Sequence, residues 1–382
     1  MTFKVQHLSG ISLRGTGAYF PARTVTNAEI LDLMIEHHFC QNDRHGAINQ
    51  LRHVLARGAG RVLKGRLRRR FPQDADLIKH FGFPPSIVEK MGIDRRQWAH
   101  RIGDRLESDG EHCLDMAMHA AKDALEDARL TPGEIDALVV TTTTPPRINS
   151  SSALWMADRL GIAAPAYDLR AGCSGGLYGL LNASLYLQHG AQNVLVVGAE
   201  AYSRYLPPTN RDAIFLAGDG AGAAVLSRSA GPEGVIAGLI GADGQYDRRF
   251  FTRGGMPPTP EAAARGHYYV EGEPRDMVEA SFKRYLTIIP EVLEAAGLGI
   301  EAIDYHVPHQ TSLSVIKSVA ARIGHPLDRT FVNIHEHGNI GSACLLAGLH
   351  EARAQGELKP GSKLLTSVVG GTMTWGAMVW QL

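Results

Sequence analysis

Three residues of this sequence have the side chains and the surroundings that thioester chemistry needs, and the first is a cysteine. Cys173 lies in Gly172-Cys-Ser-Gly-Gly, where an extended segment turns into a helix. Glycines permit the sharp turn, and the positive end of the helix favours the thiolate form of the sulfur. Cys173 is therefore a candidate nucleophile. The other cysteines fall within helical patterns and suit buried structural positions: Cys40, Cys113 and Cys344.

The two partners of this nucleophile come later in the sequence. His309 follows an apolar run in Val307-Pro-His-Gln-Thr-Ser-Leu, and Asn339 stands in His337-Gly-Asn-Ile-Gly-Ser, which we place opposite Cys173 in an internal repeat. Histidine is the usual general base and asparagine a neutral donor, so the set suits covalent catalysis on thioesters. Metal binding is the alternative for His306, His309, His335 and His337. No acidic or cysteine ligand shares a coordinating spacing with them, so we predict no metal site.

The elements that hold these residues repeat along the chain. Residues 124–136 read ALEDARLTPGEID and residues 292–304 read VLEAAGLGIEAID, at an offset of 168 residues. In both, a helix ends in a turn of small residues and a buried strand begins. The glycine turns at Cys173 and Asn339 each open a helix that leads into a further apolar strand. Two matches in the same order predict a duplicated α/β unit.

The apolar strands of this unit show no alternation of apolar and polar residues. Residues 138–142 and 194–198 are continuous apolar runs, which are typical of strands buried on both faces. Helices must then cover both sides of each sheet. We place an N-terminal half at residues 1–230, with a basic helical insertion at about 36–86, and a C-terminal half at residues 231–382.

Charge is balanced over the chain but is unevenly distributed. The sequence has 39 basic and 39 acidic residues, yet residues 44–70 hold nine basic residues and no acidic one. Apolar residues at helical spacing predict one or two amphipathic helices in this segment. It is either a solvated insertion or a docking surface for an acidic partner, for phosphates or for a membrane surface. No recognition motif accompanies the charge, so we predict no nucleic-acid partner.

Composition and cysteine usage set the class of protein. A chain with 44% hydrophobic and 20% charged residues can bury a large core, which excludes disordered and fibrous classes. Four scattered cysteines without a CxxC pair argue against a disulfide framework or a structural zinc site. The first residues lack an apolar signal core, and no stretch approaches the ~20 apolar residues of a membrane span. We therefore expect a cytoplasmic protein without a membrane span.

Five blocks of the sequence together resemble one enzyme family. They are GCSGG at Cys173, VPHQTSL at His309, HGNIGSA at Asn339, GDGAGAAVL at residues 218–226 and GGTMTWG at residues 370–376. In this order they are similar to the blocks of the β-ketoacyl-acyl carrier protein synthase III enzymes, ketosynthases of the thiolase fold. The resemblance covers residues 10–35 and 88–382 and leaves out the basic insertion. GDGAGAAVL precedes a strand and not a helix, which excludes a dinucleotide-binding loop.

The resemblance implies a duplicated five-layer αβαβα architecture and a homodimer with the active site at the base of a tunnel. It implies that Cys173 accepts an acyl group from a coenzyme A or carrier-protein thioester and that no cofactor is needed. His309 and Asn339 would then bind the carbonyl of a malonyl or β-ketoacyl thioester during a decarboxylative Claisen condensation. The backbone N–H groups of Cys173 and Thr372 would form the oxyanion hole. Family members usually have glycine at position 372, and threonine keeps the N–H while narrowing the tunnel.

Positions that contact substrate in the family differ here. Lys90 replaces an arginine near the coenzyme A phosphates and Ser86 a tryptophan, whereas Arg204 matches an arginine at the tunnel mouth. Ile148 takes the place of a residue, usually aromatic, that crosses the dimer interface, and a smaller side chain leaves room for a longer or branched acyl chain. We therefore expect an acidic acyl carrier protein to dock on the insertion, at Arg66, Arg68, Arg69 and Arg70.

The predicted activity is that of an acyltransferase that forms a carbon–carbon bond in fatty-acid or polyketide-type biosynthesis. The alternative within the family joins two preformed acyl chains, as in dialkylresorcinol, quinolone or pyrone assembly, or transfers an acyl group to an oxygen or nitrogen nucleophile. Residues 145–150 contain no carboxylate, which weighs against a non-decarboxylative condensation. The remaining alternative is a noncatalytic partner subunit, which would not need Cys173.

Overall fold

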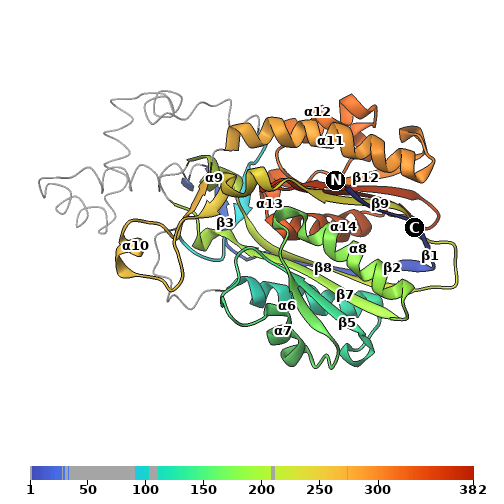
Figure 1. The fold of residues 1–382 in the computed structure, drawn as a ribbon, viewed down its shortest axis with the longest axis horizontal. Helices are drawn as coiled ribbons and strands as arrows, with labels where there is room; N and C mark the ends of the chain where they lie inside the picture. The colour runs from blue at the N-terminus through green and yellow to red at the C-terminus, as the bar shows by residue number, and fades with distance from the viewer. Residues whose placement is uncertain are drawn as a thin grey trace, which may run out of the picture.

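Two five-stranded sheets form the body of the protein, and helices lie on both faces of each sheet (Figure 1). The computed structural model describes residues 2–27, 29–30, 33, 91–102, 111–207, 211–272 and 274–382. The predictions for the basic insertion, for Lys90 and for the docking arginines Arg66, Arg68, Arg69 and Arg70 lie outside the described residues.

The first sheet has the strand order β2-β8-β7-β5-β6. Its strands are β2 (Ile11–Tyr19), β5 (Ala137–Thr141), β6 (Ala166–Leu169), β7 (Asn193–Ala201) and β8 (Asp219–Arg228). β5 is parallel to β6 and β7, whereas β8 is antiparallel to β7 and β2. Every residue of β7 is buried, because Val196 faces one layer of helices and Val197 faces the other. This confirms the prediction from the unbroken apolar run.

The second sheet has the strand order β1-β9-β14-β13-β12. Its strands are β1 (Thr2–Ser9), β9 (Gly234–Ala242), β12 (Tyr305–Pro308), β13 (Lys363–Val369) and β14 (Thr374–Gln381). β12 and β13 are parallel, and the other neighbours are antiparallel. β1 thus joins a sheet whose other strands all come from the C-terminal part of the chain. The division of the chain near residue 230 stays a prediction.

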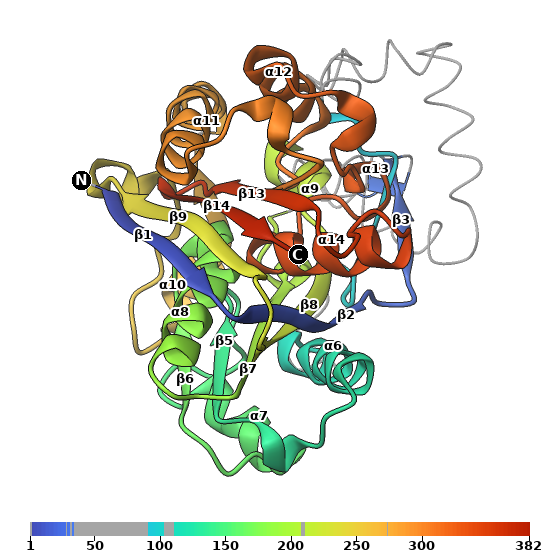
Figure 2. The same ribbon diagram turned by 90° about the vertical axis from the view of Figure 1, so that its right-hand side faces the viewer.

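Helices complete five layers. α6 (Cys113–Ala128) and α7 (Ser152–Leu160) cover the outer face of the first sheet, and α11 (Pro274–Ala296) and α12 (Leu313–Ile323) cover the outer face of the second (Figure 2). α8 (Gly175–Gln188) and α14 (Cys344–Ala354) lie between the sheets and share one apolar core with both. The order helix, sheet, helix, sheet, helix confirms the predicted αβαβα architecture.

The sequence repeat corresponds to matching elements. α6 and α11 are each followed by one residue with positive φ, Arg129 at 55° and Gly297 at 67°, which ends the helix. The 3-10 turns η2 (Pro132–Glu134) and η6 (Ile300–Ala302) then lead into β5 and β12. The two halves therefore fold in the same way around the strands that carry the site.

Smaller elements connect the layers. Two short sheets pair β3 (Thr24–Thr26) with β4 (Arg95–Gln97) and β10 (Phe250–Thr252) with β11 (Val270–Gly272). The others are η4 (Tyr202–Arg204), α9 (Arg211–Leu216), η5 (Gly244–Arg249), α10 (Pro260–Ala264), η7 (Leu327–Arg329) and α13 (Ile334–His337). No helix within the described ranges is long and apolar enough to cross a membrane.

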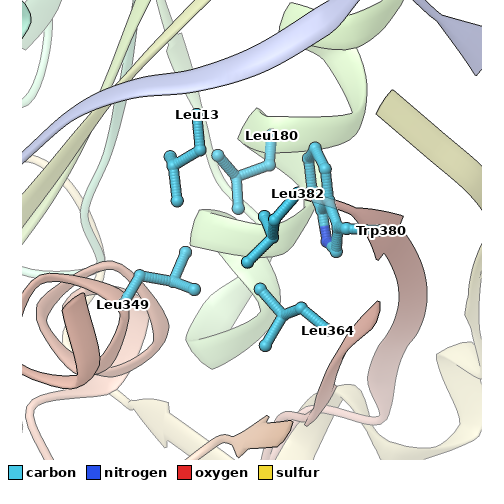
Figure 3. A pocket seen from close by; sticks show the side chains of 6 residues that line it. All are labelled: Leu13, Leu180, Leu349, Leu364, Trp380 and Leu382. Carbon is cyan, nitrogen blue, oxygen red and sulfur yellow. The ribbon is translucent and has the colours of Figure 1, made fainter. Parts of the chain in front are cut away.

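A small cavity lies in the central core between α8, α14, the edge strand β2 and the strands β13 and β14 (Figure 3). Its volume is about 10 Å³, close to the least that holds one water molecule. The lining is wholly apolar and consists of Leu13, Leu180, Leu349, Leu364, Trp380 and Leu382. None of the predicted catalytic residues lines it, so it is a packing void and not the substrate tunnel.

Candidate active site

Cys173 is held in a tight turn at the start of α8. It is the middle residue of η3 (Gly172–Ser174), and Gly172 has a φ of 55°, which glycine adopts at little cost. A Cβ atom at Gly175 would lie 1.9 Å from Oγ1 of Thr141, so only glycine lets the helix begin this close to β5. The glycines at positions 172 and 175 are thus required by one backbone angle and one close contact.

The Cys173 thiol is protonated in the resting protein. Burial raises its pKa to about 11, although a hydrogen bond from the backbone of Gly371 lowers it and the charge of Glu200 raises it again. The expectation that the helix start favours the thiolate is therefore wrong, because the loss of water around the sulfur outweighs the partial charge of one helix end. The thiol must give up its proton during attack.

His309 follows the last residue of β12 and is a neutral imidazole. Its backbone N–H donates to the carbonyl of Ser367 at 2.8 Å, and the residue is 1% exposed. Burial lowers the pKa of the imidazole to about 3, and Nδ1 has no hydrogen-bond partner among the residues that the structure describes. A neutral imidazole has one N–H and one basic nitrogen. His309 can therefore accept a proton in one step and donate to a carbonyl in another.

Asn339 presents an amide whose oxygen is already occupied. It lies between α13 and the 3-10 turn η8 (Gly341–Ala343), and its backbone bridges to Ala217. Its Oδ1 accepts a hydrogen bond from the Gly341 N–H at 2.9 Å, and the Cys344 Sγ lies 3.6 Å away as a weaker donor. This fixes the orientation of the amide and leaves Nδ2 as the group that can donate to a substrate carbonyl.

Ser342, and not Asn339, occupies the position in the second half of the chain that corresponds to Cys173 in the first half. Each is the middle residue of its 3-10 turn, and the glycines that open the turns, Gly172 and Gly341, have φ values of 55° and 57°. The prediction that Asn339 occupies the equivalent position is therefore wrong, because Asn339 precedes the turn. Since η3 and η8 pack against each other between the sheets, Asn339 still lies beside the turn that carries the nucleophile.

His309 is placed near Cys173 by the strands of the second sheet. β12 runs parallel to β13 with Pro308 opposite Ser367, so His309 and residues 370–372 follow the carboxyl ends of neighbouring strands. A Cβ atom at Gly370 would lie 3.3 Å from the backbone nitrogen of Cys173, which places these strand ends against η3. The structure thus brings the three predicted catalytic residues to one end of the interface between the sheets.

The turn between β13 and β14 supplies backbone groups next to the sulfur. Gly371, which sequence reasoning missed, is the residue whose backbone bonds to the Cys173 thiol. Thr372 also approaches η3, since a Cβ atom at Gly172 would lie 3.0 Å from its Oγ1. The Gly-Gly pair before Thr372 is the sequence signal for this close approach. The oxyanion hole formed by the N–H groups of Cys173 and Thr372 stays a prediction.

The other described substrate residues lie near residues 145–150 and on η4. Ile148 is 60% exposed. Arg204 is half-buried, and its Nε donates to Nε2 of His100 at 2.7 Å. Burial lowers the pKa of His112, the charge of Asp115 raises it, and the charges of Arg204 and Arg147 lower it, so both cations lie near His112. Positive charge at this loop suits an anionic part of a substrate.

The four histidines considered for metal binding have separate surroundings. The Nε2 of His306 lies 2.8 Å from Oγ of Ser367. The Nδ1 of His337 lies 2.9 Å from Oε1 of Gln97, and its Nε2 lies 2.9 Å from Oε1 of Glu351. No group of three or more histidine, cysteine, aspartate or glutamate side chains in the described part of the chain could hold a metal ion.

Comparison with known proteins identifies the family. The model of the 3-oxoacyl-[acyl-carrier-protein] synthase III family matches residues 167–244, which include Cys173. The model of the C-terminal part of this family matches residues 293–382, which include His309 and Asn339. A β-ketoacyl-[acyl-carrier-protein] synthase III of Cereibacter sphaeroides is 35% identical over 300 residues, 77% of this chain and 88% of the relative.

A second relative and a crystal structure agree with these matches. β-Ketoacyl-[acyl-carrier-protein] synthase III 3 of Streptomyces coelicolor is 40% identical over 276 residues, 70% of this chain and 82% of the relative. The 3-oxoacyl-[acyl-carrier-protein] synthase III of Aquifex aeolicus VF5 superposes with a TM-score of 0.76 at 27% identity, covering 98% of this chain and 100% of that one, which confirms the thiolase fold. The chain therefore belongs to the β-ketoacyl-[acyl-carrier-protein] synthase III family of condensing enzymes.

Proposed function

We propose that this protein loads an acyl group on Cys173 and extends it by decarboxylative condensation with a malonyl thioester. The observation that carries the proposal is the grouping of a protonated thiol, a neutral imidazole and an oriented amide donor at one place. A thiol beside a proton acceptor suits covalent acyl transfer, and neutral donors suit an enolate that forms later at the same site.

In the loading step, the Cys173 sulfur attacks the carbonyl carbon of an acyl thioester while its proton passes to His309. The resulting oxyanion accepts hydrogen bonds from the backbone N–H groups of Cys173 and Thr372. When this intermediate collapses, the carbon–sulfur bond of the donor breaks, and the departing thiolate takes the proton from His309. The products are acyl-Cys173 and a free thiol.

In the condensation step, the bond between the malonyl carboxylate and the α-carbon breaks and carbon dioxide leaves. The electron pair forms an enolate, whose oxygen accepts hydrogen bonds from His309 and from Nδ2 of Asn339. The carbanion attacks the acyl carbonyl, and the bond to the Cys173 sulfur breaks as the oxyanion collapses. The sulfur leaves as a thiolate and is protonated again from solvent. The two steps consume no oxidant, reductant or cofactor.

The donor is proposed to be an acyl-coenzyme A or an acyl carrier protein. Relatives are named for an acyl carrier protein. The cations Arg147 and Arg204, which both lie near His112, support recognition of a phosphate group of the donor. We retain the proposal that an acidic carrier protein docks on the basic insertion, and that Lys90 contacts the phosphates of coenzyme A.

We further propose a homodimer in the cytoplasm. β6 is the edge strand of the first sheet, and the apolar side chains of Ile148 and Leu154 nearby are 60% and 59% exposed. A free strand edge beside exposed apolar side chains supports pairing with a second copy, which would bring Ile148 to the partner's tunnel. The free thiols of Cys113, Cys173 and Cys344 support a reducing compartment.

Intact-mass measurement of the protein after exposure to a panel of acyl-coenzyme A and acyl-carrier thioesters tests the proposal. We expect an acyl adduct that is absent in Cys173→Ala, and a condensation product after a malonyl thioester is added. A product only with a second long acyl chain or a β-ketoacyl acceptor would favour the joining of preformed chains. No adduct with any donor would overturn the proposal and favour a noncatalytic subunit.

A further inference from the structure

A buried carboxylate that sequence reasoning missed lies at the carboxyl end of β7, and the reaction as proposed does not use it. Glu200 is 0% exposed. Its Oε1 accepts from the Ser342 hydroxyl at 2.6 Å and from the Thr143 N–H at 3.1 Å. Its Oε2 accepts from the hydroxyls of Thr143 at 2.8 Å and Thr144 at 2.9 Å. The one sequence signal for it is a carboxylate at the end of an unbroken apolar strand.

The first group that Glu200 holds is η8, the turn that orients Asn339. Ser342 is the middle residue of η8, and its hydroxyl donates directly to the carboxylate. A Cβ atom at Gly341 would lie 2.9 Å from Cγ of Glu200, so the carboxylate also packs against the start of the turn. Gly341 is the residue whose N–H fixes the Asn339 oxygen. Any shift of η8 would therefore turn the amide of Asn339.

The second group that Glu200 holds is the end of β5, against which the nucleophile's helix begins. Thr143 and Thr144 follow this strand, and both donate to the carboxylate. Within the same strand end, Oγ1 of Thr141 is the atom that Gly175 of α8 approaches most closely. The Ser342 hydroxyl also lies 3.2 Å from the Thr141 carbonyl. One carboxylate thus joins the segment beside Cys173 to the turn beside Asn339.

Glu200 is not placed to act as a base. A carboxylate has about four lone-pair sites, and four short hydrogen bonds from protein groups already use them. Proton abstraction from a substrate would require breaking these bonds at a carboxylate that is 0% exposed. The arrangement suits a fixed support.

We infer that Glu200 is a positioning residue, which sets the amide of Asn339 at the separation from Cys173 that the condensation step requires. This inference rests on the proposed function, since it assigns Glu200 to the step in which Asn339 binds the enolate. The inference predicts different effects on the two half-reactions, loading and condensation. Loading uses Cys173, its neighbouring backbone and His309, whereas decarboxylation of the malonyl thioester also uses Asn339, so only the second step depends on the orientation that η8 gives to this amide.

Ser342→Ala is the sharpest test, because it removes the short hydrogen bond from the Ser342 hydroxyl to Glu200 and keeps the threonine bonds, while the longer bond from the Ser342 backbone N–H, 3.4 Å from Oε1, remains. We expect decarboxylation of a malonyl thioester by unloaded enzyme to fall about tenfold, and the rate of Cys173 acylation to change by less than about twofold, since small displacements of a donor are costly only where that donor acts. Amide hydrogen exchange should rise in residues 339–344. Glu200→Leu, which removes all the bonds, should lower decarboxylation by about 100-fold if it folds.

Two further variants control for loss of structure. Ser227→Ala removes another buried serine hydroxyl, which donates to Oδ1 of Asn193 at 2.6 Å at the opposite end of β7 from Glu200, and it should leave the ratio of the two rates unchanged. Glu200→Gln keeps one oxygen for Ser342 while its amide N–H groups face hydroxyls that can accept. We expect its decarboxylation rate to lie within about threefold of the wild-type rate.

The possible results are distinct. Equal losses of both rates in Ser342→Ala, or no loss of either, would overturn the positioning role while the wild-type protein still loads and condenses. A wild-type protein that neither acylates Cys173 nor decarboxylates a malonyl thioester would refute the proposed function, and the inference with it.

Discussion

The backbone N–H of Gly341 donates to Oδ1 of Asn339 at 2.9 Å, so the substrate side of this amide is its nitrogen. Asn339→Asp keeps the shape and the acceptor for Gly341, but it replaces the donor with an anionic oxygen. We expect malonyl decarboxylation to fall by about 100-fold or more, because an oriented donor to an oxyanion is worth about that much. Acylation of Cys173, measured by intact mass on the same protein, is the internal control. Retention of more than about a tenth of the decarboxylation rate would contradict the role of Nδ2.

The contact between Gly175 and Thr141 gives a second prediction. A Cβ atom at Gly175 would lie 1.9 Å from Oγ1 and 2.9 Å from Cβ of Thr141, so Gly175→Ala must push the start of α8 away from β5. We expect the free energy of unfolding, measured in urea, to fall by about 1–3 kcal/mol, with a loss of Cys173 acylation. Gly133→Ala is the matched control, since nothing lies within 4 Å of its added Cβ. Equal stability of the two variants would show that the turn has room to move.

The architecture could be read from the sequence because its signals are local. The helix ends at Arg129 and Gly297, and the strands that follow them, lie where the 168-residue offset of the repeat places them. Unbroken apolar runs identified strands buried on both faces. The mixed composition of β1, which pairs with β9 far along the chain, offered no comparable local signal.

The site could be predicted only in part, because its remaining features depend on contacts between distant segments. Matching the two glycine motifs placed Asn339 opposite Cys173, whereas the bridge from Asn339 to Ala217 holds it two residues before η8. The helix start at Cys173 suggested a thiolate, but desolvation by the packed sheets reverses the sign of the pKa shift. The hydrogen-bond partners of Glu200 come from two separate segments, one after β5 and one in η8, and no spacing in the sequence relates them to Glu200.

A buried histidine makes stability depend on pH. Burial, and then the neighbouring His325, lower the pKa of His306 from 6.5 to about 3. Between pH 6.5 and about pH 3 the unfolded chain therefore binds a proton at His306 that the folded protein does not bind. The stability that the neutral His306 contributes is present above pH 6.5 and is lost as the pH falls toward 3. Each buried histidine of this kind lowers the free energy of unfolding by about 1.4 kcal/mol for each unit by which the pH falls within this range.

The variant His306→Gln isolates this effect. Urea denaturation between pH 7 and pH 4 should show a slope of stability against pH that is smaller by about 1.4 kcal/mol per unit than in the wild-type protein. The exposed His189 provides the control, and His189→Gln should leave the slope unchanged. Parallel stability curves for His306→Gln and the wild-type protein would show that His306 is protonated in the folded state.

The protonated thiol gives a kinetic prediction that separates burial from the helix end as the dominant influence on Cys173. With burial raising its pKa to about 11, the thiolate fraction at neutral pH is small and rises about tenfold for each pH unit. Alkylation of Cys173 by iodoacetamide, followed by peptide mass analysis, should therefore accelerate steadily from pH 7 to about pH 10. Cys173→Ala identifies the background from Cys40, Cys113 and Cys344, of which the last two are more deeply buried than Cys173. A rate that levels off below pH 8 would show that the helix end and the Gly371 backbone stabilise the thiolate after all, and loading would then need no proton transfer to His309.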